Sequence, residues 1–161
     1  MARIAPADLP EDLPVHNNIV RLTYRNPDMH RGFASLSGRV HSASHLDHRL
    51  RELVVLSVLA RLRAGYEWQQ HTVAALRAGV TSEEVAAIER GDLSGFADAE
   101  RVAMEVAVAV DGVAMSNPLW EAARRHYDEV QLLDMAMLAG FYGLAARVVL
   151  ALDVDLEEPA G

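Results

Sequence analysis

Apolar residues return every three or four positions along almost the whole chain, and no segment alternates apolar and polar residues like a half-buried strand. This period predicts an all-α fold, a compact bundle of about seven or eight helices. The most apolar of the expected helices starts at Asp47, which can cap it, and runs to Arg63 with little polar face. A helix that is apolar nearly all round belongs at the centre of a bundle.

Turn and capping residues divide the rest of the chain into shorter helices. We expect helices at Val15–Leu22 before Asn26-Pro27, over Met29, Phe33, Leu36 and Val40, over Tyr66–Ala78, after the Thr81–Glu84 capping box, and after caps at Asp98, Asn117-Pro118 and Asp128. Gly79 should end the helix before it. No linker separates these segments, so we expect a single domain over residues 1–161, with a polar leader at 1–14 and a loose acidic tail at 153–161.

The composition excludes several kinds of chemistry. The 161 residues include no cysteine and no lysine, and all 15 basic residues are arginine. No thiolate can therefore attack a peroxide or bind zinc, and no lysine can form a Schiff base or serve a P-loop. The net charge of -8 argues against a nucleic-acid partner, because proteins that bind nucleic acids hold the phosphates with basic side chains.

Neither end of the chain indicates export or a membrane span. The N-terminus lacks the apolar core of a signal peptide. The stretch from Val130 to Leu152 is long and apolar, but it contains Asp134 and Arg147, and each charge is costly in hydrocarbon. We therefore expect a cytoplasmic protein in which this stretch is a buried helix, with no membrane partner.

Three titratable residues stand out as candidates for acid–base chemistry. Glu67 and His71 are four residues apart on one expected helix, so they project from the same face. A histidine beside a carboxylate is the usual equipment for moving a proton near neutral pH. Glu52 lies inside the most apolar helix and needs a partner there. The spacing alone also fits an ordinary surface pair and a Glu52 that bonds an arginine.

A combination of motifs in register resembles a known family. It consists of Arg-x-Arg-Glu at 49–52, Tyr-Glu-Trp-x-x-His at 66–71 and the run at 78–84. These motifs resemble the carboxymuconolactone decarboxylase family, which includes the alkylhydroperoxidase D-like proteins. The resemblance is close over residues 46–89 and looser at 139–147, which is similar to the closing segment of the family. It implies the helical fold of that family.

The resemblance also separates two activities within the family. Peroxidase members carry a glutamate, a Cys-x-x-Cys pair and a histidine, and these positions fall on Glu52, on Ala64 and Glu67, and on His71. Both thiols are missing, so cysteine-based hydroperoxide reduction is excluded. Decarboxylase members have Glu-x-x-x-His, which matches Glu67 and His71. The resemblance therefore implies a lyase or isomerase that needs no cofactor and acts on a small carboxylated or lactone substrate.

Roles for single residues follow from the same resemblance. His71 would transfer the proton, Glu67 would orient it or tune its charge, and Glu52 would be a second acid or would hold the His71 tautomer. An arginine would bind the substrate carboxylate through its planar fork, with Arg49, Arg51 and Arg61 as candidates. Tyr66 and Trp68 are candidates for the walls of the site, although aromatic residues at helical spacing more often belong to the core.

The remaining histidines carry weaker signals. His41, His45 and His48 have the spacing of metal ligands, but Ser44 and Asp47 should interrupt the helix between them, so we expect no metal site. The other three stand alone and are expected to be surface or hydrogen-bonded residues: His16, His30 and His126.

The family resemblance further implies a homo-oligomer, a trimer, hexamer or dimer. A rival interpretation is an oligomeric family member without catalytic activity that binds a ligand or a protein. A thiol-independent step on an oxidised metabolite is also open. The two main interpretations differ in whether Glu52, Glu67 and His71 converge on a pocket.

Overall fold

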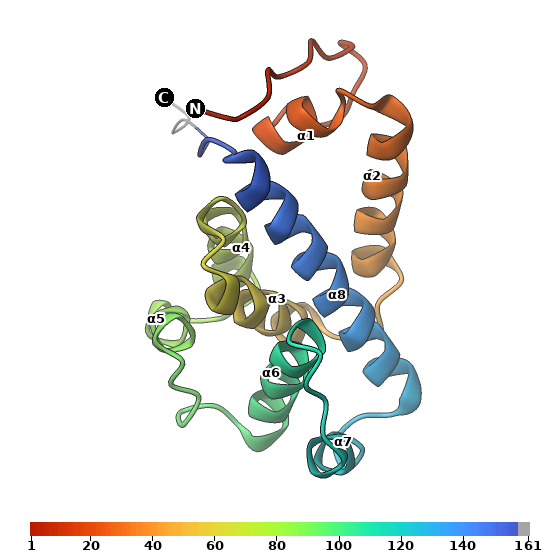
Figure 1. Ribbon diagram of the computed structural model, residues 1–161. Coiled ribbons are helices and arrows are strands. Elements are labelled where there is room, and N and C mark those ends of the chain that lie inside the picture. Colours follow the sequence, from red (N-terminus) through yellow and green to blue (C-terminus); the bar gives the residue numbers. More distant parts are fainter. Residues whose placement is uncertain (158–161) are drawn as a thin grey trace.

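The computed structural model describes residues 1–157, and within them the chain forms eight α-helices and no strand (Figure 1). This confirms the expected all-α bundle. The helices are α1 (Asn18–Thr23), α2 (Pro27–Ser42), α3 (His48–Leu62), α4 (Gly65–Arg77), α5 (Ser82–Arg90), α6 (Asp98–Asp111), α7 (Asn117–Ala123) and α8 (Glu129–Leu152).

Helix α3 is the central element, as its apolar sequence predicts. Every residue from Leu50 to Leu59 is buried, and α3 packs against α4, α5, α6 and α8. The Asp47 carboxylate caps the helix by accepting a 2.8 Å hydrogen bond from the Leu50 N–H. Arg63 ends the helix in the left-handed conformation, with φ +54°.

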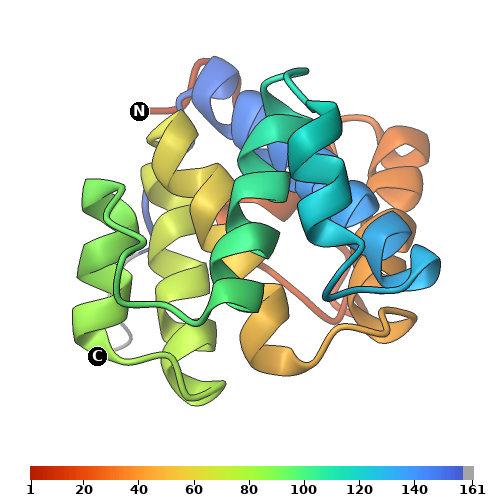
Figure 2. The ribbon, with the colours of Figure 1, turned by 90° about the horizontal axis from the view of Figure 1, so that it is seen from below.

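Helix α8 is the longest helix and crosses the molecule diagonally in Figure 1, between α2 and α4. By length and composition it is the one described helix that could span a membrane, but half of that stretch is buried in the protein, against α2, α3 and α6. Figures 1 and 2 both show α2 and α5 on opposite sides of the molecule. Gly143 allows the side chain of Asp111 on α6 to approach the α8 backbone closely.

Three local expectations are wrong in detail. Met29 is 70% exposed, so it does not share the buried face of α2 with Val40. The helix expected after Asp98 is capped at Ala97, and Asp98 bonds Arg101 and His126 instead. The side chain that caps α7 is Ser116 rather than Asn117.

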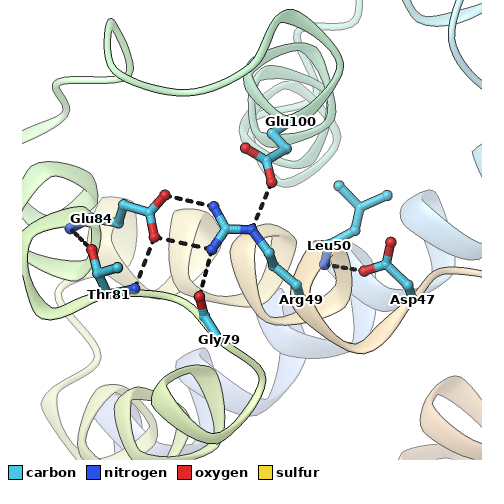
Figure 3. Close-up of polar contacts among 7 residues, drawn as sticks. All are labelled: Asp47, Arg49, Leu50, Gly79, Thr81, Glu84 and Glu100. Atoms are coloured by element: carbon cyan, nitrogen blue, oxygen red, sulfur yellow. Dashed lines mark hydrogen bonds and ion pairs between the residues drawn. The ribbon is translucent and has the colours of Figure 1, made fainter.

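Arg49 ties three helices together on the side of α3 that faces α5 and α6 (Figure 3). Its guanidinium donates to Glu84 of α5 at 2.6 Å, to Glu100 of α6 at 2.7 Å and to the Gly79 carbonyl at 2.8 Å. Glu84 also closes the capping box with Thr81 at the start of α5. The donors of Arg49 are therefore committed to this network.

The N-terminus and the described part of the acidic tail lie together beside the end of α8. The Met1 amine pairs with Asp155 at 2.8 Å, and the Arg3 N–H donates to the Leu152 carbonyl at 2.8 Å. Glu157 accepts a 2.7 Å hydrogen bond from the Asn18 N–H. The described part of the acidic tail, residues 153–157, is therefore tied down rather than loose, and residues 158–161 of that tail lie outside the described residues.

Candidate functional site

A cavity of about 490 Å³ lies between α1, α2, α4 and α8, with residues 13–15 of the leader along its wall. Most of its lining is apolar: Leu13, Pro14, Val15, Ile19, Val20, Phe33, Ala34, Phe141 and Ala145. The titratable side chains among its lining residues are His30, Tyr66, Glu67, His71 and Tyr142. An apolar pocket with a few convergent polar groups is the usual form of a small-molecule site.

His71 is held in this cavity by Glu52. The Glu52 carboxylate on α3 lies 2.8 Å from Nδ1 of His71 on α4, and the side chains are 8% and 13% exposed. A carboxylate accepts, so Nδ1 carries a hydrogen, and in the neutral ring Nε2 is left with a lone pair. Of the two roles open to Glu52 in the sequence, this geometry is the one that fixes the His71 tautomer.

Glu67 lies one helical turn before His71 and lines the same cavity. Its side chain is buried, and this burial raises the pKa of the carboxyl, while the charge of nearby His71 acts in the opposite direction. A carboxyl with a raised pKa keeps its proton further toward neutral pH, and such a group can act as an acid. Glu52, Glu67 and His71 therefore converge.

Tyr142 of α8 forms the wall against which His71 packs. The two rings are 4.6 Å apart at 82°, an edge-to-face arrangement. Burial raises the pKa of the Tyr142 phenol well above its usual range. The His41 Nδ1 donates to the Ser37 carbonyl at 2.9 Å, so in the neutral ring Nε2 accepts from the Tyr142 hydroxyl at 3.1 Å. Tyr142 is therefore neutral and fixed in place.

Of the two aromatic candidates, the structure brings Tyr66 to the cavity but not Trp68. The Tyr66 hydroxyl donates to Glu157 and accepts from the Ile19 N–H, so it joins α4 to α1 and to the described part of the acidic tail. Trp68 packs instead against the hydrophobic core, because it points from a different face of α4.

None of the three arginine candidates lines the cavity. Arg49 is held by Glu84 and Glu100, and Arg61 pairs with the buried Asp111. Arg51 is buried and donates to the carbonyl of His41 at 2.9 Å. The arginine fork expected for a substrate carboxylate therefore has no counterpart among the lining residues.

Two of the other histidines lie near His71 or in the cavity, namely His41 and His30, and the rest lie elsewhere. His41 bonds Tyr142, His45 bonds Asp134 of α8 at 3.1 Å, and no group of three possible metal ligands occurs within residues 1–157. His16 and His126 are hydrogen-bonded near the surface. His30 differs, because it is 7% exposed and lines the cavity.

His30 and Tyr142 line the cavity, although neither is a site candidate in the sequence. His30 shares a helical face of α2 with Phe33 and Ser37, a weak signal that could have marked it as inward-facing. Tyr142 lies in the segment that resembles the end of the family, but nothing local shows that it meets His71, which is 71 positions earlier in the chain.

The model of the carboxymuconolactone decarboxylase family matches residues 27–109, which span α2 to most of α6. No curated protein matches the chain significantly.

Several solved structures share the fold. An uncharacterized peroxidase-related protein from Silicibacter sp. TM1040 has a TM-score of 0.80 and 17% identity, over 91% of this chain and 80% of that one. An uncharacterized peroxidase-related protein from Ralstonia eutropha JMP134, described as an alkylhydroperoxidase AhpD core, has a TM-score of 0.78 and 18% identity, over 88% and 77%.

The debrominase Bmp8 is also similar in fold. A cysteine-to-alanine variant in complex with 2,3,4-tribromopyrrole has a TM-score of 0.78 and 22% identity, over 90% of this chain and 79% of that one. At such identities these solved structures show a common fold and not a common activity.

Proposed function

Because the chain belongs to the carboxymuconolactone decarboxylase family and has its alkylhydroperoxidase D-like fold, we propose that it is a lyase or isomerase that moves a proton to or from carbon in a small acid or lactone. The observation that carries this proposal is the convergence of His71, its partner Glu52 and the buried Glu67 at one apolar cavity. Thiol peroxidase chemistry is excluded, since the chain has no cysteine.

His71 is the proposed base. Glu52 fixes its Nδ1–H, so the Nε2 lone pair can take a proton from a carbon next to a carbonyl. Glu67 is the proposed acid, because its raised pKa favours the protonated form that can give a proton to a second carbon. In an isomerisation one C–H bond breaks and another forms, and the proton on His71 returns to Glu67 through solvent, so the enzyme ends each turnover unchanged.

Decarboxylation needs one proton donor, and we assign that role to His71, with a proton on Nε2 and with Nδ1–H held by Glu52. When the bond to the carboxylate breaks, carbon dioxide leaves and its bonding electrons stay in a dienolate. The Nε2–H proton of His71 then goes to carbon, and Nε2 regains a proton from solvent. Both reactions use only side chains of this chain, and each such acid–base step contributes about 100- to 10,000-fold to the rate.

Substrate retention is assigned to the apolar walls and the neutral polar groups, since the lining residues include no arginine.

The test is turnover of 4-carboxymuconolactone, followed by ultraviolet absorbance. We expect the wild type to consume it and His71→Gln to lose at least about 100-fold in kcat. His126→Gln, which changes a histidine in the turn between α7 and α8 that bonds Asp98, should retain the wild-type rate. If the wild type binds the lactone but never turns it over, the chain is a binding member of the family instead.

We also propose that the chain works as a cytoplasmic homo-oligomer with a small-molecule substrate and without nucleic-acid or membrane partners. The support for self-association is an exposed apolar face on α8 made of Val130, Leu133, Met137 and Leu144. Apolar residues gathered on one helix face often mark an interface.

A further inference from the structure

The cavity has a second histidine, which the proposed reaction does not use. His30 of α2 is 7% exposed and lines the cavity together with Ile19 and Phe33. Its ring packs edge to face on Tyr24, with centroids 5.4 Å apart. A buried imidazole must satisfy or expose both of its ring nitrogens.

The hydrogen bonds around Thr23 determine which nitrogen of His30 carries the hydrogen. Nδ1 of His30 lies 2.9 Å from the Thr23 hydroxyl oxygen. That hydroxyl has a single hydrogen, which it donates to the Ile19 carbonyl at 2.8 Å, with the Val20 carbonyl at 3.2 Å. The hydroxyl must therefore accept from His30, so Nδ1 is protonated and Nε2 of the neutral ring offers a lone pair.

Among the described residues 1–157, that lone pair has no hydrogen-bond partner. Within residues 1–157, the fully enclosed side-chain polar atoms that lack a partner are Arg51 Nε and Thr72 Oγ1, and His30 Nε2 is not one of them. Nε2 is therefore not fully enclosed, although the residue as a whole is buried, and His30 is one of the residues that line the cavity.

We infer that His30 Nε2 is an acceptor subsite that binds the O–H or N–H of a small, mainly apolar substrate. Val20, Phe33 and Phe141 give the same cavity hydrocarbon walls, so most of the ligand surface can be apolar while its donor pairs with His30 Nε2. The inference rests on the proposed function only in that the reacting part of this substrate lies at His71 and Glu67. The substrate is then a small enol, a phenol-like hydroxyl compound or a cyclic amide.

The test uses two probes that differ by one donor, 4-methylphenol and its methyl ether, with binding to the full chain measured by calorimetry. We expect the wild type to bind the phenol about fivefold more tightly than the ether, the ratio that one net hydrogen bond gives. His30→Phe should bind both equally, while His71→Gln should keep the preference. The ratio thus reports on His30 whether or not His71 is catalytic.

A second measurement does not depend on a probe or on His30→Phe folding. Nitrogen-15 spectra of the histidine rings should show His30 in the Nδ1–H tautomer, and Thr23→Val should remove that preference. The inference is overturned if His30 is in the Nε2–H tautomer, if the phenol fails to bind or binds no better than the ether, or if His30→Phe keeps the ratio. A preserved ratio with undiminished turnover in His71→Gln would instead overturn the proposed function alone.

Discussion

Burial affects the pKa of Glu67 more than the charge of nearby His71 does. Below pH 4.5, the ordinary value of the carboxyl, the folded and the unfolded chain both hold the proton. Above it the unfolded chain ionises first, because burial raises the pKa of Glu67 in the folded state. The native protein therefore binds more protons there, and stability is lost as the pH rises through the raised value.

We accordingly expect Glu67→Gln to be more stable than the wild type at about pH 7 and to lose this advantage near about pH 4. The neutral amide removes the cost of a buried charge. Urea unfolding at both pH values measures the difference in the free energy of unfolding. Glu11→Gln, in the exposed leader, is the control, and an equal response of both variants would contradict a perturbed Glu67.

At the level of the elements, Arg49 is a structural link rather than a substrate ligand. Its guanidinium lowers the pKa of Glu84 to about 2, which adds stability that is present above pH 4.5 and is lost as the pH falls through about 2. Arg49→Leu should destabilise the fold by about 1–3 kcal/mol at neutral pH. It should also remove that part of the acid dependence, because Glu84 loses its partner.

Urea unfolding as a function of pH checks this expectation, with the exposed Arg77→Leu as the control variant. Turnover per folded molecule should be unchanged in Arg49→Leu. If Arg49→Leu is as stable as the wild type but loses much of its substrate affinity, Arg49 binds the substrate carboxylate, as the sequence suggests.

Gly143 of α8 packs closely against the side chains of Asp111 and Arg147. A Cβ there would lie 2.6 Å from the Asp111 carboxylate and 2.8 Å from the Arg147 guanidinium. The Asp111 side chain is fully buried and pairs with Arg61 and Arg147, so it has little room to move. Gly143→Ala should therefore cost about 1–3 kcal/mol of stability.

The matched control is Gly140→Ala on the same helix, where nothing lies within 4 Å of the added carbon. It should be neutral or stabilise the protein by up to about 1 kcal/mol, because alanine is the better helix former. Denaturant midpoints compare the two, and an equal loss in both variants would mean that the Asp111 contact is not the cause.

The sequence predicts the helices more completely than it predicts the candidate site. Apolar period and capping chemistry predict α3, its Asp47 cap and its central position, because these are local properties of the chain. The sequence predicts the caps of α6 and α7 one position late, at Asp98 and Asn117. The choice of cap depends on backbone geometry as well as on side-chain type. The sequence reveals the pair Glu67 and His71 because the two residues are one helical turn apart.

The contacts that shape the cavity join distant segments. Tyr142 meets His71 from α8, and Thr23 fixes His30 from α1, so only tertiary packing brings them together. Likewise, nothing in the Arg49–Glu52 motif shows that Glu84 and Glu100 occupy the guanidinium of Arg49. A sequence pattern shows which side chains could bind a substrate. Which partner such a side chain actually takes is decided by tertiary packing.

At the scale of the whole molecule, the exposed face of α8 predicts self-association. Val130, Leu133, Met137 and Leu144 are between 48% and 60% exposed. We expect a mass above that of the monomer by light scattering and dissociation in Met137→Glu, because a charge at the centre of an apolar interface lacks a partner. Val73→Glu, at an exposed apolar position of α4, should leave the mass unchanged. A monomeric wild type at every concentration would contradict the expectation.

The transfer of a proton between the protein and a substrate carbon is the central claim, and solvent deuterium tests it most directly. We expect the wild type to convert 4-carboxymuconolactone in D₂O to a decarboxylated product with deuterium on a ring carbon, seen by NMR. His71→Gln should form that product at least about 100-fold more slowly. No conversion by the wild type, a product without carbon-bound deuterium, or an equal rate in His71→Gln would contradict the claim.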